Sequence, residues 1–260
     1  MSEVQNNYDA SHIQVLEGLE AVRKRPAMYI GDTSIKGLHH LVSEVVDNCI
    51  DEALAGYAND IKVFILEDNS IKVIDNGRGI PVEMHEKGIS AERLVFTTLH
   101  AGGKFDDSAY KTSGGLHGVG SSVVNALSTH LKVTIKRNGH VYEDEYERGN
   151  PITELVDGLL PEKGRTRETG TSINFTPDGT IFDRTVFKAD EIKSRLHETA
   201  YLNPNLTIRF KDNRMDEPEE IVFHEEEGIR GFVKAINKGL EYMAYVRKTI
   251  DVSEVKKQEK

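Results

Sequence analysis

Apolar residues recur every three or four positions between Leu38 and Leu54, at 38, 41, 42, 45, 46, 50, 53 and 54. This spacing is typical of an amphipathic helix with one buried stripe. A carboxylate can polarise water, and a carboxamide oxygen is a hard ligand suited to Mg²⁺. Taken alone, polar residues on such a helix are better explained as a solvated face. Four of them fall at neighbouring positions four residues apart: His40, Glu44, Asn48 and Glu52.

The other apolar patterns predict a mixture of strands and helices. Two strand-like runs, 60–67 and 70–74, are joined by Asp68-Asn69, and two more, 131–136 and 140–146, are joined by Asn138-Gly139. Such dipeptides are typical of hairpin turns. Further strands are expected at 171–176 and 206–210, and further helices at 13–25, 91–99, 121–128, 188–201 and 228–243.

A glycine-rich turn, Asp75-Asn-Gly77-Arg78-Gly79-Ile80-Pro81, directly follows the second predicted strand. An aspartate at the end of a strand can accept a hydrogen bond from an amino group such as that of adenine. The glycines allow the backbone to approach a flat ring closely. Taken alone, this segment is better explained as a tight turn without any ligand, because aspartate, asparagine and glycine favour turns.

A second glycine-rich segment, Ser113-Gly-Gly-Leu-His-Gly-Val-Gly-Ser121, leads into a predicted helix. Successive backbone amides and a helix N-terminus can together cradle an anion such as a triphosphate. Lys104 lies upstream of this segment and can reach a phosphate or remain ordinary surface. The sequence contains neither GxxxxGK[ST] nor GxGxxG, so a P-loop or a dinucleotide-binding fingerprint is excluded.

Composition describes an acidic globular protein. The formal net charge of the 260 residues is -10. This charge argues against a domain that binds nucleic acid on its own, because such domains normally present a basic face. The acidic segment 216–227 is expected to form a solvated edge strand and loop. No apolar run approaches the roughly 20 residues of a membrane span. The single cysteine, Cys49, cannot form an internal disulfide, so a reducing cytoplasm is the expected location and no membrane association is expected.

The order of these motifs resembles the GHKL superfamily of ATPases, and most closely the ATPase domain of bacterial type II topoisomerases. The resemblance implies an α+β fold of the Bergerat type. This fold is a two-layer sandwich whose mixed, mostly antiparallel sheet carries helices on one face. The resemblance extends from about residue 8 to about residue 240 and rests on five segments: GLEAVRKRPAMYIGD (18–32), GLHHLVSEVVDNCIDEALAG (37–56), VIDNGRGIP (73–81), TTLHAGGKFDDSAYKTSGGLHGVGSSVVNALS (97–128) and ETGTSINFTP (168–177).

The resemblance also implies roles for individual residues. Glu44 matches the general base that activates water for attack on the γ-phosphate of ATP, and His40 is placed to orient it. Asn48 matches the ligand of Mg²⁺, and Asp75 matches the aspartate that reads adenine, supported by Thr171. The remaining residues expected to contact the nucleotide are Tyr8, Glu52, Arg78, Gly79, Ile80, Pro81, Lys104, Tyr110, Gly115, Leu116, His117, Gly118, Val119, Gly120 and Ser121. For Glu52 there is an alternative, which is to pair with Arg78 or solvent.

Domain organisation and partners follow from the same resemblance. Residues 1–14 are expected to form a dimerisation arm, residues 15–222 the ATPase domain, and residues 223–260 the start of a transducer domain with a charged tail. ATP binding would then drive homodimerisation and close a gate for DNA strand passage. The expected partner is a DNA-cleaving A subunit in an A2B2 heterotetramer, and double-stranded DNA would contact the full complex.

Two other functions remain open on the sequence alone. One is a different GHKL clamp ATPase, of the mismatch-repair or heat-shock chaperone kind. The other is a module that senses nucleotide without hydrolysing it, because the lysine that the transducer supplies to the γ-phosphate in the family is not recognisable in this chain.

Overall fold

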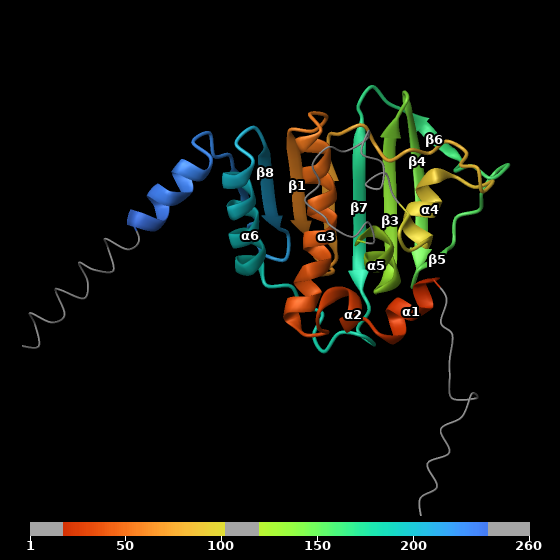
Figure 1. Cartoon of the computed structure of the whole chain (residues 1–260), viewed down its shortest axis with the longest axis horizontal. Helices are drawn as coiled ribbons and strands as arrows, with labels where there is room; N and C mark the ends of the chain where they lie inside the picture. Colours follow the sequence, from red (N-terminus) through yellow and green to blue (C-terminus); the bar gives the residue numbers. More distant parts are fainter. Residues whose placement is uncertain (1–17, 102–119, 239–260) are drawn as a thin grey trace, which may run out of the picture.

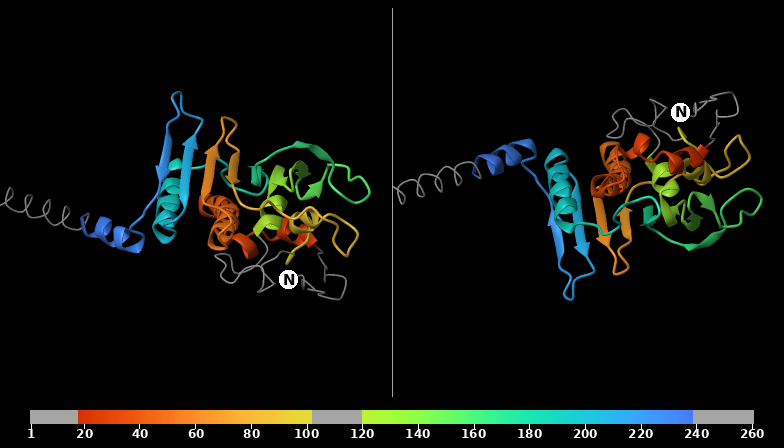
Figure 2. Two further views of the ribbon diagram at one scale, coloured as in Figure 1. Left: turned by 90° about the horizontal axis from the view of Figure 1, so that it is seen from above. Right: turned by 90° about the horizontal axis from the view of Figure 1, so that it is seen from below.

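The computed structural model describes residues 18–101 and 120–238, in which one sheet is covered on one face by helices (Figure 1). Views from above and below show the same two layers, with the helices gathered on one side of the strands (Figure 2). The expected α+β sandwich is therefore confirmed. Among these residues no helix is long and apolar enough to cross a membrane.

The described residues contain six named helices and nine strands. The helices are α1 (Gly18–Lys24), α2 (Ala27–Ile30), α3 (Ile35–Leu54), α4 (Ala91–Thr97), α5 (Gly120–Ala126) and α6 (Ala189–Leu202), and residues 229–238 are also helical. The strands are β1 (Asp60–Ile65), β2 (Ile71–Asp75), β3 (Ser128–Arg137), β4 (His140–Glu147), β5 (Asn150–Pro151), β6 (Glu162–Arg165), β7 (Gly170–Pro177), β8 (Thr207–Asp212) and β9 (Glu220–Phe223).

The strand order of the sheet is β5-β4-β3-β7-β2-β1-β8-β9, and β6 pairs with β4 outside this path. Every pairing is antiparallel except that of β1 with β8, so the sheet is mixed and mostly antiparallel, as expected. The acidic segment contributes β9 at one edge of the sheet, which confirms the predicted edge strand. The short strands β5 and β6 were not predicted.

Helix α3 begins at Ile35, three residues before the first apolar position used to predict it. The Ser34 hydroxyl accepts a hydrogen bond from the amide of Lys36 at 3.3 Å, and Asp32 Oδ1 accepts one from the amide of Gly37 at 3.0 Å. These contacts satisfy amides that have no partner within the helix, which fixes where the helix starts.

The core lies between α3 and the helix-covered face of the sheet. Burial alternates along β1 and β2, so Ile61, Val63 and Ile65 face the helices while their neighbours face the other side. Apolar residues of α3 such as Leu38 and Leu41 are fully buried against this face. This packing fixes the rotation of α3, and the row of polar residues therefore points away from the core.

Three chain segments meet where the antiparallel strands β2 and β7 pair. Ile74 near the end of β2 lies opposite Ser172 near the start of β7, so Asp75 and Thr171 become neighbours. Helix α3 packs against β2, and α5 packs against α3. The glycine-rich turn, the polar row of α3 and the start of α5 are thereby gathered in one place.

Candidate active site

His40 and Glu44 are in contact on the exposed side of α3. Their Nε2 and Oε1 atoms lie 3.1 Å apart, and the two side chains are 39% and 28% exposed. The hydrogen bond with Glu44 raises the pKa of His40 above its ordinary value. The contact fixes the position of the Glu44 carboxylate relative to the imidazole ring.

The start of α5 lies directly against Glu44. A Cβ atom at Gly120 would lie closer to Oε2 of Glu44 than van der Waals contact allows, so a larger residue there would displace the Glu44 carboxylate from its observed position. One turn along α3 from Glu44, the Asn48 amide nitrogen donates a hydrogen bond to the Ser121 hydroxyl at 3.1 Å. Gly120 and Ser121, which end the second glycine-rich segment, therefore contact the two residues of α3 to which the resemblance assigns catalysis and metal binding.

Asp75 forms the buried floor of the site. Its Oδ1 atom accepts hydrogen bonds from the backbone amides of Gly77 at 2.8 Å and Thr171 at 3.4 Å. Its Oδ2 atom lies 3.6 Å from the thiol sulfur of Cys49 on α3. Burial raises the pKa of this carboxyl group to about 6. Within the described ranges no lysine, arginine or histidine forms an ion pair with it, so its charge is not neutralised by a structural partner.

Glu52 holds the glycine-rich turn in shape. Its two carboxylate oxygens accept hydrogen bonds from the Arg78 guanidinium at 2.7 and 3.1 Å and from the Arg78 amide at 3.1 Å. The guanidinium carbon also lies 3.8 Å from the centre of the Tyr57 ring. Glu52 thus makes the pairing that the sequence left as the alternative to nucleotide contact.

The rest of the turn is fixed by residues distant in sequence. The Thr171 hydroxyl accepts a hydrogen bond from the amide of Ile80 at 3.3 Å, and Arg137 donates to the carbonyl of Gly79 at 3.0 Å. Gly79 has a φ of 77°, which favours glycine. Pro81 is exposed at the end of the turn.

Several expected site residues lie outside the described ranges. These are Tyr8, Lys104, Tyr110, Gly115, Leu116, His117, Gly118 and Val119.

The donor set fits a magnesium ion that is held mainly by phosphates. Mg²⁺ on a nucleotide is usually bound by one or two protein oxygens plus phosphates and waters. The Asn48 side chain carries one oxygen of this kind, and its amide nitrogen donates to Ser121. Within residues 18–101 and 120–238, no three His, Cys, Asp or Glu side chains gather as a metal site, so a cage made of protein alone is not present there.

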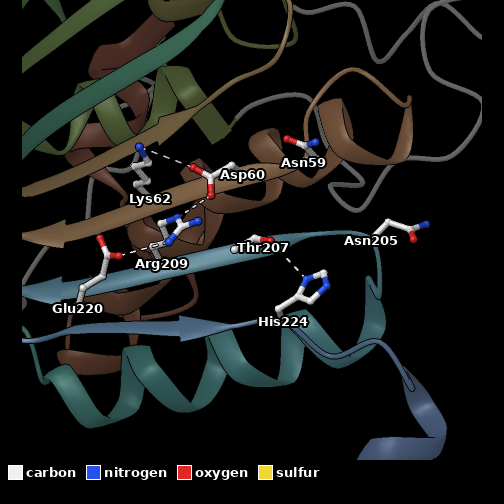
Figure 3. Close-up of a pocket in the computed structure, with 8 residues that line it drawn as sticks. All are labelled: Asn59, Asp60, Lys62, Asn205, Thr207, Arg209, Glu220 and His224. Carbon is white, nitrogen blue, oxygen red and sulfur yellow. Dashed lines mark hydrogen bonds and ion pairs between the residues drawn. The ribbon is translucent and has the colours of Figure 1, made fainter.

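A separate hollow of about 590 Å³ lies at the ends of β1, β8 and β9, on the face of the sheet away from the helices (Figure 3). Its two cations, Lys62 and Arg209, pair with Asp60, and Arg209 also pairs with Glu220. Because these charges match one another, the hollow offers no unmatched charge to a ligand.

Sequence reasoning did not find Cys49 as part of this site. Its only signal was position, because Cys49 follows Asn48 on α3 and therefore turns toward the sheet rather than along the polar row. The contact with Asp75 depends on how α3 packs against β2, which residue types alone do not specify.

Comparison with known proteins identifies this arrangement. A family model described as "Histidine kinase-, DNA gyrase B-, and HSP90-like ATPase" matches residues 33–181, which contain the polar row, the glycine-rich turn and Thr171. The chain belongs to this ATPase family.

The most similar relatives include B subunits of DNA gyrase and B subunits of DNA topoisomerase 4. The chain is 56% identical over 240 residues to the B subunit of DNA gyrase from Halalkalibacterium halodurans, a match that covers 92% of the chain and 37% of the relative. It is 54% identical over 237 residues to the B subunit of DNA topoisomerase 4 from Enterococcus faecalis, covering 90% and 34%. The chain thus spans about a third of the length of these relatives.

A solved structure shares the fold. The crystal structure of the 43K ATPase domain of Thermus thermophilus gyrase B, in complex with an aminocoumarin, superposes with a TM-score of 0.74 at 42% identity. The match covers 85% of this chain and 55% of that one. The chain is therefore an ATPase domain of the kind found in the B subunits of type II topoisomerases, and the family implies that it binds ATP.

Proposed function

We propose that this domain hydrolyses ATP with Glu44 as general base and His40 as the residue that positions it. The observation that carries the proposal is the 3.1 Å contact between the two side chains, directly beside Gly120 at the start of α5. A carboxylate has about four lone-pair sites, so the contact with His40 does not exhaust its capacity to accept a proton from water. This reaction needs positioning and electrostatic stabilisation, with little covalent chemistry from the protein.

Asp75 and Asn48 bind the two ends of the nucleotide in this proposal. Asp75 accepts a hydrogen bond from the amino group of adenine. Thr171 supports this site because its amide donates to Asp75 and its hydroxyl accepts from the amide of Ile80. Asn48 would contribute an oxygen to Mg²⁺, which neutralises phosphate charge when bound. The turn residues Gly79, Ile80 and Pro81 line the base, whereas Arg78 and Glu52 hold that turn.

The residues outside the described ranges keep the roles implied by the family. Lys104, Tyr110 and the segment 115–119 close over the phosphates, and the arm 1–14 with Tyr8 reaches a second copy of the chain. The ATPase domain is assigned to residues 15–222 and the start of the transducer to 223–260, a division that falls one residue before the end of β9.

At the level of the whole protein, we propose the B subunit of a cytoplasmic type II DNA topoisomerase. The relatives are named as B subunits of DNA gyrase and of DNA topoisomerase 4, which supports double-stranded DNA as the substrate. A DNA-cleaving A subunit would complete an A2B2 assembly, and ATP-driven dimerisation would close the gate. These relatives favour a topoisomerase over a mismatch-repair or chaperone clamp.

The test compares Glu44→Gln with the wild-type chain and with Glu198→Gln, a matched change at an exposed position of α6. Loss of a general base reduces a rate by about 100- to 10,000-fold. We expect Glu44→Gln to lose hydrolysis by that factor and to keep its ATP affinity within a few-fold, with Glu198→Gln unchanged in both. Hydrolysis at the wild-type rate by Glu44→Gln would contradict the assignment. A wild-type chain that binds ATP without turnover would favour nucleotide sensing for a chain of this length.

A further inference from the structure

Among the hydrogen-bond donors to the Asp75 carboxylate, one is a side chain, the thiol of Cys49. Asp75 Oδ1 is held by two backbone amides, from Gly77 and Thr171. Its Oδ2 atom, by contrast, has the Cys49 thiol at 3.6 Å. The two side chains belong to residues that are only 8% and 5% exposed. The thiol therefore contacts the oxygen that the two backbone amides do not hold.

The Cys49 sulfur is a hydrogen-bond donor in this environment. Burial and the charge of Asp75 raise the pKa of the thiol well above its ordinary value, so the proton stays on sulfur. That proton has two acceptors within reach, the carbonyl of Val45 at 3.4 Å and Oδ2 of Asp75 at 3.6 Å. Both distances are ordinary for hydrogen bonds that involve sulfur, so donation to Asp75 is geometrically available.

We propose that Cys49 is a positioning residue for base selection, whose thiol donates to Oδ2 of Asp75 and keeps that oxygen an ionised acceptor for the amino group of adenine. The proposal rests on the proposed role of Asp75 in reading adenine. Guanine presents a carbonyl oxygen where adenine presents an amino group. An ionised carboxylate therefore accepts from adenine and repels guanine, whereas a protonated carboxyl group could donate to guanine.

Opposing contributions set the pKa of Asp75, so a weak donor such as the Cys49 thiol can shift that pKa measurably. Desolvation raises the pKa of Asp75 to about 6, and the charge of Glu52 acts in the same direction. The bonds from Gly77, Thr171 and Cys49 oppose this increase.

The charged groups around Asp75 come from α3 and from the turn. Helix α3 contributes Glu52, whose charge acts on Asp75, and Asp51, whose charge acts on Cys49. The turn contributes Arg78, which is held by Glu52. Strand β7 contributes only the uncharged Thr171, and β1 places the apolar Ile61 opposite Asp75. Deleting the thiol should therefore raise the pKa of Asp75, since no cation from these elements contacts the carboxylate in its place.

The experiment measures the affinities of ATP and GTP, each with Mg²⁺, between pH 5.5 and 8.5 for the wild type, Cys49→Ala and Cys49→Ser. Because both nucleotides carry the same triphosphate, the ratio of their affinities cancels titration of the phosphates and binding of the metal. In the wild type the preference for ATP should decline as the pH falls through about 6. In Cys49→Ala the same decline should begin about half a unit to one unit higher.

Cys49→Ser is the matched control, because its hydroxyl is a donor of similar size. Cys49→Ser should keep the wild-type pH dependence of the ratio of ATP to GTP affinity. If the role of Cys49 were purely structural, Cys49→Ala would weaken the binding of both nucleotides equally and leave this ratio unchanged. Thermal unfolding of each variant shows whether it folds. If Cys49→Ala and the wild type gave the same pH dependence of the ratio, the inference would be overturned.

Asp75→Asn separates this inference from the proposed function. If Asp75→Asn binds ATP as the wild type does, Asp75 does not read adenine, and the proposed function fails at that residue. If Asp75→Asn loses ATP while Cys49→Ala behaves as the wild type, only the role of Cys49 fails.

Discussion

Two buried aspartates of this domain have opposite surroundings. Asp178, which follows β7, is fully buried and accepts hydrogen bonds from Arg23 at 2.8 Å and Arg148 at 3.0 Å. It also accepts bonds from the amide and hydroxyl of Thr180 at 2.9 and 2.7 Å. Asp75 is nearly as buried, but its donors are two amides and a thiol.

The pKa values of the two groups move in opposite directions for this reason. The amide and hydroxyl of Thr180 and the two arginines together outweigh the desolvation of Asp178, and its pKa falls well below the ordinary value. Desolvation dominates at Asp75, where the pKa rises to about 6. A buried carboxylate that is paired with arginines, such as Asp178, thus stabilises the fold. A buried carboxylate without a cation, such as Asp75, is a candidate for binding a ligand.

The largest expected effect is on stability, at Asp178. Asp178→Ala removes the acceptor shared by Arg23 and Arg148, and breaking such a buried pair costs about 3–5 kcal/mol. Urea unfolding should show this loss, while the ATP affinity of the folded fraction stays unchanged. The control is Asp190→Ala on α6, whose side chain is 93% exposed. A loss below about 1 kcal/mol at Asp178 would show that the network does not hold the fold.

The next largest effect is the pH dependence of the free energy of unfolding at Asp75, where the pKa is raised instead of lowered as at Asp178. Because the folded-state pKa of about 6 lies above the ordinary 3.8, the folded state retains the proton longer than the unfolded state. Asp75 therefore lowers the free energy of unfolding as pH rises from 3.8 through 6, by at most about 3 kcal/mol.

Asp75→Asn removes this titration. The difference between its unfolding free energy and that of the wild type, measured from pH 4 to pH 8, should increase toward high pH. If the unfolding free energies of the two proteins changed in parallel with pH, the ionised form of Asp75 would not destabilise the folded state.

Arg148→Ala should have the smallest effect. The Arg148 side chain is 50% exposed, compared with 25% for Arg23, so solvent screens its attraction to Asp178. We expect a loss of at most about 1 kcal/mol for Arg148→Ala and a larger one for Arg23→Ala, measured by the same urea unfolding. If Arg148→Ala destabilised the domain as much as Asp178→Ala, burial would not explain the ranking of these contacts.

Local patterns predicted the elements that depend on local chemistry. The apolar spacing predicted α3, and Asn138-Gly139 predicted the β3–β4 hairpin, because both signals lie within a few residues of the structure that they specify. The start of α3 was missed by three residues because the cap at Asp32 and Ser34, rather than the first apolar position, fixes it. The two-residue strand β5 is too short to carry a pattern.

The long-range contacts of the site could not be predicted from residue types. Cys49 meets Asp75 across 26 positions, and Arg23 meets Asp178 across 155. Asp75 and Asp178 both follow a predicted strand, and only the glycine-rich turn after Asp75 distinguishes it in the sequence. The positions of Arg23 on α1 and of Arg148 directly after β4 give Asp178 its two cations, and these positions are set by packing that residue types do not specify.

The role of Asp75 as the acceptor for adenine can be tested by a calorimetric titration of ATP into Asp75→Asn at pH 8. The substituted amide would present a donor to the amino group of adenine, and losing a hydrogen bond to a charged acceptor reduces affinity by about 10- to 100-fold. We expect this loss in a protein whose free energy of unfolding is higher than that of the wild type. ATP binding at wild-type affinity would contradict the assignment, because the unmatched carboxylate would then have no role in binding the nucleotide.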